Sequence, residues 1–351
     1  MPRALYTYYL KFCEFSFLAC EVSPGFLYSG EKWLIIRTGS LLCQFHIFYE
    51  GEGHLHKILE KRRLSHDAER EQDVYYFKVT APEIARNRKA GQFLILQVDE
   101  DFGERVPLTI ADANAEEGWV AIVFQTVGAS TLKLAQFKEG DTIPVMVGPL
   151  GSPTHIEKIG TVVCVGGGIG VAPMHPIVQA HHRAGNHVIA IIGARSKDLV
   201  IFEEEMRRAA DEVIVVTDDG SYGRKGLVTE PLKELCEGKD GHAMPNEVVA
   251  IGPPIMMKFC VATTKPFNVP TTVSLNTIMI DGTGMCGCCR VSVGGETKFV
   301  CVDGPEFDGF KVDFDNMMQR MRAFRDREQA DYQKAKDHIC RIGLDAGKAG
   351  A

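Results

Sequence analysis

The sequence predicts an antiparallel β-barrel followed by a doubly wound parallel α/β domain, with a cysteine-rich segment near the C-terminus. Three observations support this fold class. Short β-branched and aromatic segments separated by turn residues run from residue 56 to about 156. Continuous apolar segments then alternate with helical patterns to about residue 272. Finally, four cysteines gather between residues 286 and 301.

Composition excludes several classes of protein. The 351 residues are 45% hydrophobic and 24% charged, an ordinary globular balance that argues against a disordered chain, a collagen or a coiled coil. The net charge of −7 comes without a long basic stretch, so we expect no nucleic-acid partner. Apolar runs near the N-terminus reach only about a dozen residues, whereas a membrane span needs ~20. We therefore expect no membrane span.

Residues 1–55 differ from the rest of the chain. They are rich in aromatic residues and cysteine and lack clear periodicity. Lys11 and Glu14 interrupt any apolar core of a signal peptide, and the acidic residues argue against a mitochondrial transit peptide. We interpret this segment as a non-native or disordered extension, although no Met lies between Met1 and Met146 to serve as an ordinary later start.

The barrel is expected within residues 56–156. Glycine, proline, asparagine and aspartate separate its short segments and favour turns between them. The predicted strands are 73–80, 92–98, 106–110, 119–125 and, closing the barrel, 142–147.

The α/β domain is expected within residues 157–272. Strands at 161–168, 188–194, 212–220 and 247–254 are apolar throughout, as expected for a parallel sheet covered on both faces. A cysteine-rich segment follows at 273–312. The tail at 313–351 is charged and helix-prone, and Met317, Met318, Met321 and Phe324 fit one helical face.

A glycine-rich turn follows the first parallel strand. Glycines between a strand and a helix let backbone N–H groups approach a phosphate. The G-x-G-x-x-A pattern fits only with a one-residue slip, so a plain tight turn remains an alternative. Because ligands bind at the carboxyl ends of parallel strands, the residues after the fourth strand belong to the same prediction. The candidate nucleotide-binding residues are Gly166, Gly167, Gly168, Gly170, Gly252 and Pro253.

Two acidic residues bear on the choice of nucleotide. Asp218 and Asp219 follow the third parallel strand, where carboxylates would accept hydrogen bonds from ribose hydroxyls and repel a 2′-phosphate. This favours NAD(H), whereas Arg195 after the second strand favours NADP(H). Both can also be ordinary polar residues at strand ends, so the choice stays open.

The barrel carries a candidate phosphate-binding motif. Arg105 begins RVPLT, and a guanidinium matches a pyrophosphate bidentately. Pro107 indicates an edge strand or bulge facing a ligand. A surface arginine on a barrel strand is the alternative. Gly128 would let the backbone approach a phosphate, and the hydroxyl of Ser130 or Thr131 could donate to it.

The cysteine-rich segment has the spacing of a metal site. Asp281, Cys286, Cys289 and Cys301 follow D-x4-C-x2-C-x11-C, which becomes a [2Fe–2S] pattern when the aspartate is replaced by cysteine. We predict these four as ligands. Cys288 lies between two of them and is a possible substitute ligand or a free thiol. A structural zinc site is the rival, but the uneven glycine-rich loop suits iron–sulfur better.

The order of these segments resembles the ferredoxin–NADP⁺ reductase superfamily. Within it, the chain is similar to electron-transfer subunits of dihydroorotate dehydrogenase and to small subunits of NADH-dependent reduced ferredoxin:NADP⁺ oxidoreductase, also known as sulfide dehydrogenase. The stretches that carry the resemblance are RVPLTIAD (105–112), VFQTVGAST (123–131), GPLG (148–151), VGGGIGVAPM (165–174), VTDDGSYGRKG (216–226), MIDGTGMCGCC (279–289) and VCVDGPEFDG (300–309). The first group carries cysteine at position 281 and the second aspartate, so Asp281 favours the second. Cys288 departs from the glycine of both.

This resemblance implies that FAD is bound by Arg105, Pro107, Leu108 and Thr109, with Gly128, Ser130 and Thr131 at its phosphates. It also implies a function. It implies bound FAD, a [2Fe–2S] cluster and NAD(H) or NADP(H), with electrons passing to a larger, glutamate-synthase-like flavin and iron–sulfur subunit and through that complex to ferredoxin, with electron bifurcation. It assigns no general acid or base, so we name no catalytic residue. The rivals are a subunit serving dihydroorotate oxidation and a non-enzymatic metal-binding module. Clustered thiols in a reducing compartment predict a cytoplasmic protein.

Overall fold

The computed structural model describes residues 21–26, 32–38, 41–45, 56–99 and 103–349. The chain divides into two compact units, Met1–His54 and Leu55–Ala351. In the first, β1 (Glu21–Phe26), β2 (Lys32–Thr38) and β3 (Leu41–Phe45) form an antiparallel sheet in that order. Most residues of the extension predicted at 1–55 lie outside the described ranges, so that interpretation stays a prediction.

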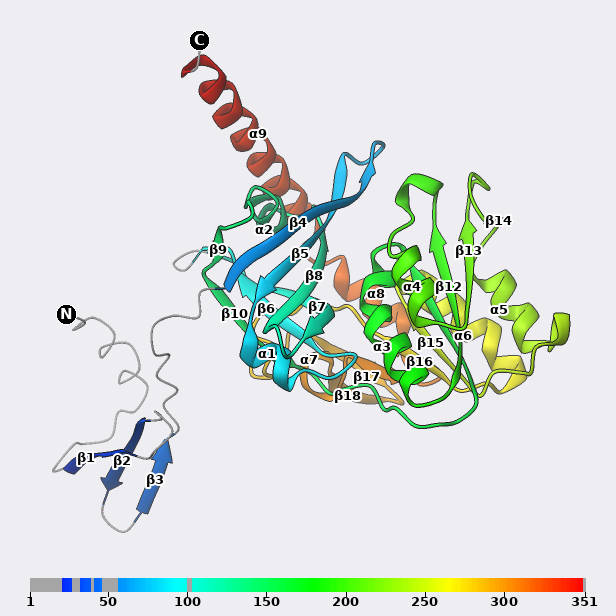
Figure 1. Ribbon diagram of the computed structural model, residues 1–351, viewed down its shortest axis with the longest axis horizontal. Coiled ribbons are helices and arrows are strands. Elements are labelled where there is room, and N and C mark those ends of the chain that lie inside the picture. The colour runs from blue at the N-terminus through cyan, green and yellow to red at the C-terminus, as the bar shows by residue number, and fades with distance from the viewer. Residues whose placement is uncertain (1–20, 27–31, 39–40, 46–55, 100–102, 350–351) are drawn as a thin grey trace. The chain divides into compact units, whose positions relative to one another are not determined.

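The second unit begins with a seven-stranded antiparallel barrel, as predicted (Figure 1). Its strand order is β10-β6-β7-β8-β5-β4-β9. The strands are β4 (His56–Asp67), β5 (Gln72–Thr80), β6 (Phe93–Gln97), β7 (Val106–Asn114), β8 (Trp119–Gln125), β9 (Thr142–Ile143) and β10 (Val145–Leu150). Two short helices, α1 (Pro82–Asn87) and α2 (Ala129–Leu134), connect them. Side chains such as Phe77, Leu94 and Ile122 fill the interior.

Two irregularities shape the barrel. The closing segment changes partner at Pro144, because β9 pairs with β4 while β10 pairs with β6. Strand β7 is also divided. Its first residues, 106–109, pair with β6, whereas 110–114 pair with β8, with a bulge between Ile110 and Asp112. Pro107 therefore lies on a stretch that pairs on one side, as a proline in a strand predicts.

The second sheet has the order β14-β13-β12-β11-β15-β16-β19. All neighbouring strands run parallel except the last pair, β16 and β19. The parallel α/β prediction is confirmed, with two further strands that the sequence did not indicate, β14 and β16, and an antiparallel edge. The strands are β11 (Thr161–Gly167), β12 (His187–Ala194), β13 (Glu212–Thr217), β14 (Arg224–Lys225), β15 (Glu247–Ile251), β16 (Thr271–Ser274) and β19 (Glu306–Asp308).

Helices cover both faces of this sheet. Alternate residues of β11 point to opposite sides, so Val162 and Cys164 pack in one cluster with α3 (Val171–Arg183) and α4 (Glu203–Ala209). Val163 and Val165 pack in another cluster with α5 (Thr229–Cys236) and α6 (Pro254–Thr264). Burial on both faces explains why these strands read as unbroken apolar runs.

The C-terminal part contains small elements beside the sheet. These are the hairpin β17 (Arg290–Val293) and β18 (Glu296–Phe299), with α7 (Val300–Asp303), α8 (Phe314–Met321) and α9 (Arg325–Ala349). The predicted apolar helical face is only partly correct. Met317 is buried and Met318 and Met321 pack beside it, but Phe324 is 47% exposed because α8 ends before it.

Helix α9 packs against α2 of the barrel and extends away from it (Figure 1). Within the described ranges, no helix has both the length and the apolar character that crossing a bilayer requires.

Candidate functional site

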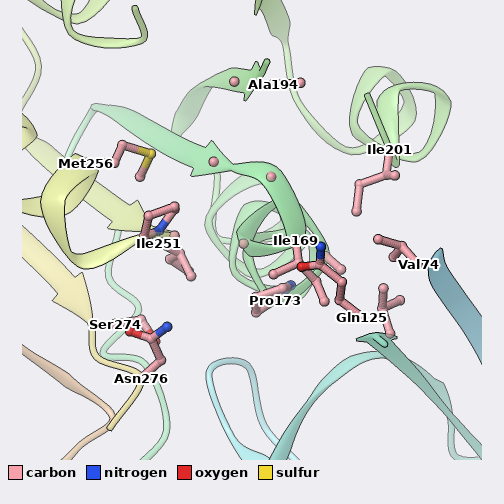
Figure 2. Close-up of a pocket in the computed structure, with 18 of the residues that line it drawn as sticks. Val74, Gln125, Ile169, Pro173, Ala194, Ile201, Ile251, Met256, Ser274 and Asn276 are labelled. Atoms are coloured by element: carbon pink, nitrogen blue, oxygen red, sulfur yellow. The ribbon is translucent and has the colours of Figure 1, made fainter. Parts of the chain in front are cut away.

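A cavity of about 810 Å³ lies between the barrel and the parallel sheet. Figure 2 shows side chains from both domains facing it: Val74 and Gln125 from the barrel, and Ile169, Pro173 and Ile251 from the α/β domain. Its volume is in the range of small-molecule and cofactor pockets. It also lies at the carboxyl ends of β11, β12 and β15, the edge at which α/β sheets bind ligands.

The barrel wall of the cavity is formed by the one-sided stretch of β7. Pro107, Leu108 and Thr109 line the cavity there, together with Val123 of β8. Because this stretch of β7 pairs with β6 alone, its other edge is left to face a ligand. The wall is mainly apolar with a few polar groups, which suits a flat aromatic ligand.

The opposite wall is formed by glycines packed too closely for side chains. A Cβ added to Gly170 would lie 2.3 Å from the carbonyl oxygen of Ile251 and 2.7 Å from Cα of Gly252. The turn after β11 and the turn after β15 therefore touch through their backbones. Gly167, Gly168 and Pro253 line the cavity beside this contact. The glycine turn is thus a packed backbone surface beside the cavity, and α3 begins directly after it.

Charged groups gather at one end of the cavity. Asp218 and Arg195 line it from the sheet, and Asp67 and Arg70 from the end of β4 and the following turn. Burial raises the pKa of Asp218, and the Arg195 charge opposes this. Asp219 instead turns away to accept hydrogen bonds from the backbone N–H and hydroxyl of Ser221, which lower its pKa.

The predicted phosphate-binding residues of the barrel lie outside the cavity. Arg105 is exposed just before β7. The Ser130 hydroxyl donates to a carboxylate oxygen of Glu104 at 2.7 Å. The Thr131 hydroxyl caps α2, since its oxygen accepts from the backbone N–H groups of Val127 and Gly128, both at 3.1 Å. Ser130 and Thr131 lie in the first turn of α2, and Arg105 follows Glu104, the residue that the Ser130 hydroxyl contacts.

The structure thus divides the predicted nucleotide and flavin residues in two. Those that line the cavity are Pro107, Leu108, Thr109, Gly167, Gly168, Gly170, Asp218, Gly252 and Pro253. Those that do not line it are Arg105, Gly128, Ser130, Thr131, Gly166 and Asp219. Gly166 has a packing role, because an added Cβ would lie 2.9 Å from Cα of Val171.

Sequence reasoning missed part of the lining. Ser274 ends β16, the last parallel strand, and Asn276 and Thr277 follow it, so their place at a strand end could have revealed them. Asp67 and Arg70 carried no such signal, because β4 reads as a run of charges.

The cysteine-rich segment forms part of the cavity wall. Thr277 lines the cavity, and its hydroxyl lies 3.5 Å from the carbonyl oxygen of Cys289. The Cys289 thiol in turn lies 3.2 Å from the Cys301 sulfur, and both residues are only 1% exposed. Burial, reinforced by the hydrogen bond from Cys289, raises the pKa of the Cys301 thiol to about 12. Metal binding there must displace the thiol protons.

The other two predicted ligands lie on the loop before β17. One carboxylate oxygen of Asp281 accepts from the backbone N–H of Thr283 at 2.9 Å, and the other accepts from that of Cys286 at 2.7 Å. These bonds hold the pKa of Asp281 below its ordinary value. The loop needs glycine at Gly282, where φ is +75° and an added Cβ would lie 2.4 Å from Ile95.

Among the described residues, no three His, Cys, Asp or Glu side chains converge on one point where a metal ion could be held. The pairs Cys289–Cys301 and Asp281–Cys286 are each held together. The residue types fit an iron–sulfur centre, because thiolates are the donors that such clusters take. Cys288 is half-buried, and its backbone N–H lies 3.5 Å from the Cys286 sulfur.

Comparison with known proteins also separates a nucleotide-binding domain from an iron–sulfur segment. Residues 164–262 match the oxidoreductase NAD-binding domain, and residues 276–313 match the iron–sulfur cluster binding domain of dihydroorotate dehydrogenase B. A Thermotoga maritima protein named as a homolog of the dihydroorotate dehydrogenase B (NAD⁺) electron transfer subunit is 44% identical over 280 residues, covering 80% of this chain and 95% of the relative. The corresponding subunit of Desulforamulus reducens is 34% identical over 68% of this chain and 92% of its own length.

A solved structure is also similar. It comes from a study of flavin-based electron bifurcation in NADH-dependent reduced ferredoxin-NADP oxidoreductase. The two chains superpose with a TM-score of 0.74 at 43% identity, covering 81% of this chain and 99% of the other.

The fold and the site define a ferredoxin reductase-like oxidoreductase subunit with an NAD-binding domain and an iron–sulfur cluster-binding domain. The chain belongs to the family of dihydroorotate dehydrogenase B-type electron transfer subunits. Its relatives are described as subunits of larger enzymes, which implies a partner subunit. The expectation of an electron-transfer subunit with these two domains is confirmed.

Proposed function

We propose that the chain moves electrons between NAD(P)H, FAD and a [2Fe–2S] cluster and delivers them to a larger flavin and iron–sulfur subunit. One observation carries this proposal. The cysteine-rich segment itself supplies Thr277 to the wall of the cavity between the two domains, and the Thr277 hydroxyl lies 3.5 Å from the carbonyl oxygen of Cys289. A cofactor that contacts Thr277 in the cavity would be separated from the buried thiol pair by that one side chain.

When bound, FAD supplies hydride exchange with a nicotinamide and one-electron exchange with an iron–sulfur centre. The barrel strip of Pro107, Leu108 and Thr109 would hold its ring against the apolar wall. Arg105, Gly128, Ser130 and Thr131, around the start of α2, would hold its phosphates. For Ser130 this requires its hydroxyl to leave Glu104.

The nucleotide would lie on the glycine wall. Gly167, Gly168 and Gly170 bring the backbone to the cavity surface, and Gly252 and Pro253 extend that surface from the neighbouring strand. Gly166 keeps the turn packed against Val171. Asp218 would accept from ribose hydroxyls, while Asp219 shapes the turn through Ser221.

Asp281, Cys286, Cys289 and Cys301 would hold the cluster. The Cys289 and Cys301 thiols are close enough to serve one iron atom together, and burial keeps water from them. The carboxylate of Asp281 would exchange its backbone hydrogen bonds for a metal bond. An oxygen ligand is harder than sulfur, so it alters the reduction potential of the centre.

Asp281 also favours one type of complex. Small subunits of ferredoxin:NADP⁺ oxidoreductase, which this chain resembles, carry aspartate at this position. The large subunit of that complex is glutamate-synthase-like and receives electrons from ferredoxin. We therefore place this chain in such a cytoplasmic complex, with electron bifurcation as the coupled reaction. The second candidate is a subunit for dihydroorotate oxidation, favoured by the names of the relatives.

Purification of the native complex tests this proposal. The expected preparation contains FAD, iron and sulfide, and a large subunit, and it reduces NADP⁺ with NADH and reduced ferredoxin. Oxidation of dihydroorotate with NAD⁺ by the same preparation would instead support the second candidate. A preparation that lacks flavin and reduces no dye with NADH would contradict both.

A further inference from the structure

The charged end of the cavity is built from both domains. Arg195 follows β12, directly after Ala194, which Figure 2 shows at the cavity. Its guanidinium Nη1 lies 3.0 Å from a carboxylate oxygen of Glu69, and Nη2 contacts the carboxylate of Asp67. Both acids belong to the end of β4 and its following turn, so two carboxylates of the barrel face one guanidinium of the α/β domain.

Asp67 binds Arg195 from a buried position. The residue is only 6% exposed, and a buried carboxylate needs a counter-charge. Arg70 is more distant, with its Nε 3.9 Å from Asp67, although its backbone N–H donates to the other carboxylate oxygen at 3.3 Å. Arg195 is therefore the nearest cation to this carboxylate among the residues that the structure describes.

These groups set the charge that a nucleotide would meet. Asp67, Asp218 and Arg70 line the cavity beside Arg195, and Glu69 contacts Arg195 from outside the lining. Three carboxylates thus face two guanidinium groups. An additional phosphate would meet net negative charge at this end, whereas a ribose carrying only hydroxyls would find acceptors in Asp218.

We propose that Asp67, assisted by Glu69, is a positioning residue that selects the nucleotide through Arg195. By holding the guanidinium against the barrel, it withholds the Arg195 charge at the end of β12 from a 2′-phosphate. This inference rests on the proposed function, because it places the adenosine half of the nucleotide at this end of the cavity. Arg195 favours NADP(H) and Asp218 favours NAD(H). With Arg195 held by Asp67, the inference predicts a preference for NAD(H).

Equilibrium binding tests the inference without any electron transfer. Calorimetry on the purified full chain would compare ADP-ribose with 2′-phospho-ADP-ribose, so loss of the redox function leaves the readout intact. Wild-type protein is expected to bind ADP-ribose more tightly. In Asp67→Asn/Glu69→Gln, 2′-phospho-ADP-ribose should bind about tenfold more tightly while ADP-ribose changes less than about twofold, because a freed guanidinium makes a charge-assisted hydrogen bond.

Matched variants separate selection from general damage. Glu60→Gln removes a carboxylate paired to Arg62 at 2.7 Å on the same strand and should leave both affinities unchanged. Asp67→Glu keeps the carboxylate and should keep the wild-type ratio of the two affinities. Adding Arg195→Ala to the double variant should abolish its gain in affinity for 2′-phospho-ADP-ribose. If the double variant fails to fold, Glu69→Gln alone, at a residue whose side chain is 84% exposed, should still shift the ratio severalfold in the same direction.

Three results would overturn the inference. One is wild-type preference for the 2′-phosphorylated ligand that Arg195→Ala removes, since Arg195 would then be the phosphate ligand. Another is an unchanged ratio in the acid variants. The last is that neither ligand binds the folded chain, whether or not the native complex transfers electrons.

Discussion

The cavity and the cysteine-rich segment reach their chemistry in different ways. At the cavity, the glycine turns after β11 and β15 touch so closely that Gly170 has no room for a side chain. On the cysteine loop, the Asp281 carboxylate accepts hydrogen bonds from the backbone N–H groups of Thr283 and Cys286. Of the four predicted ligands, Cys289 and Cys301 are the two whose side chains are in contact. The cavity is preformed by sheet packing, whereas the four predicted cluster ligands are not brought to one point.

This difference indicates what holds each region. Parallel strands fix the cavity through buried apolar contacts that need no ligand. The cysteine loop has few such contacts on its outer side, where Met285 is 86% exposed and Ile280 51%. Bonds from ligand to metal would therefore supply folding energy to the loop but little to the cavity.

Removing a buried thiol should give the largest effect and would sharpen this comparison most. Cys301→Ser is expected to eliminate the cluster altogether, since serine is a poor ligand for iron, while the NAD-binding domain stays folded. Iron and sulfide content and the visible spectrum of anaerobic protein measure this.

Cys288→Ser is the matched control for that experiment, because this residue lies in the same loop outside the predicted ligand set. It should retain the cluster. Full iron content in Cys301→Ser, or its loss in Cys288→Ser, would show that the ligands are wrongly assigned.

A second change tests whether the cavity is fixed by packing. Gly170→Ala places a Cβ 2.3 Å from the carbonyl oxygen of Ile251, so the free energy of unfolding should fall by about 1–3 kcal/mol. Nucleotide affinity should fall with it, because the two turns must separate. Urea unfolding measures the first effect. Unchanged stability would mean that the turns yield freely and that the cavity is not preformed.

Glu306 of β19 contacts Thr154, which lies in the segment between β10 and β11, and this contact predicts a pH dependence. Its carboxylate accepts from the Thr154 hydroxyl at 2.7 Å. Burial raises its pKa from 4.5 to about 7, so the folded state holds a proton that the unfolded state releases. The stabilisation is complete below about pH 4.5 and is lost as the pH rises through 7.

Glu306→Gln should remove this contribution. Between pH 5 and 8, the wild-type protein should lose about 1–3 kcal/mol of unfolding free energy relative to the variant. Denaturation series at both pH values compare the two proteins. Parallel pH profiles would count against a buried, protonated Glu306.

The smallest expected effect on stability is at the start of α2. Gly128→Ala meets no atom within 4 Å, and φ of −144° is ordinary for alanine, so stability should change by less than about 0.5 kcal/mol. Flavin affinity should nevertheless fall severalfold, because this backbone is predicted to contact a flavin phosphate. Fluorescence titration with FAD measures it, and unchanged affinity would remove Gly128 from the proposed site.

The sequence could predict the barrel and the parallel sheet because their strands differ in how apolar residues are spaced along them. The apolar runs of β11, β12, β13 and β15 require burial on both faces, and the strand β8 was predicted with its observed ends. Strand β4 was not predicted, because it carries many charges, such as Lys57, Glu60 and Arg63. It buries few residues, among them Ile58.

The site was predictable where function depends on the backbone. The turns at Gly167–Gly170 and Gly252–Pro253 follow strand ends that the pattern already located. The contact of Arg195 with Asp67 joins residues 128 positions apart, and the capping role of Thr131 depends on the local turn at Gly128. Such pairings require the folded chain, so sequence reasoning could name Arg195 but not its partner.

An anaerobic titration of the purified chain with NADH, followed by visible absorbance and low-temperature EPR, tests the central claim most directly. We predict that flavin absorbance bleaches and that the EPR signal of a reduced [2Fe–2S] centre rises in the same preparation, and that Cys301→Ser retains the bleaching without the signal. A wild-type protein that contains zinc in place of iron, or whose flavin bleaches while an intact cluster stays oxidised, would contradict the account.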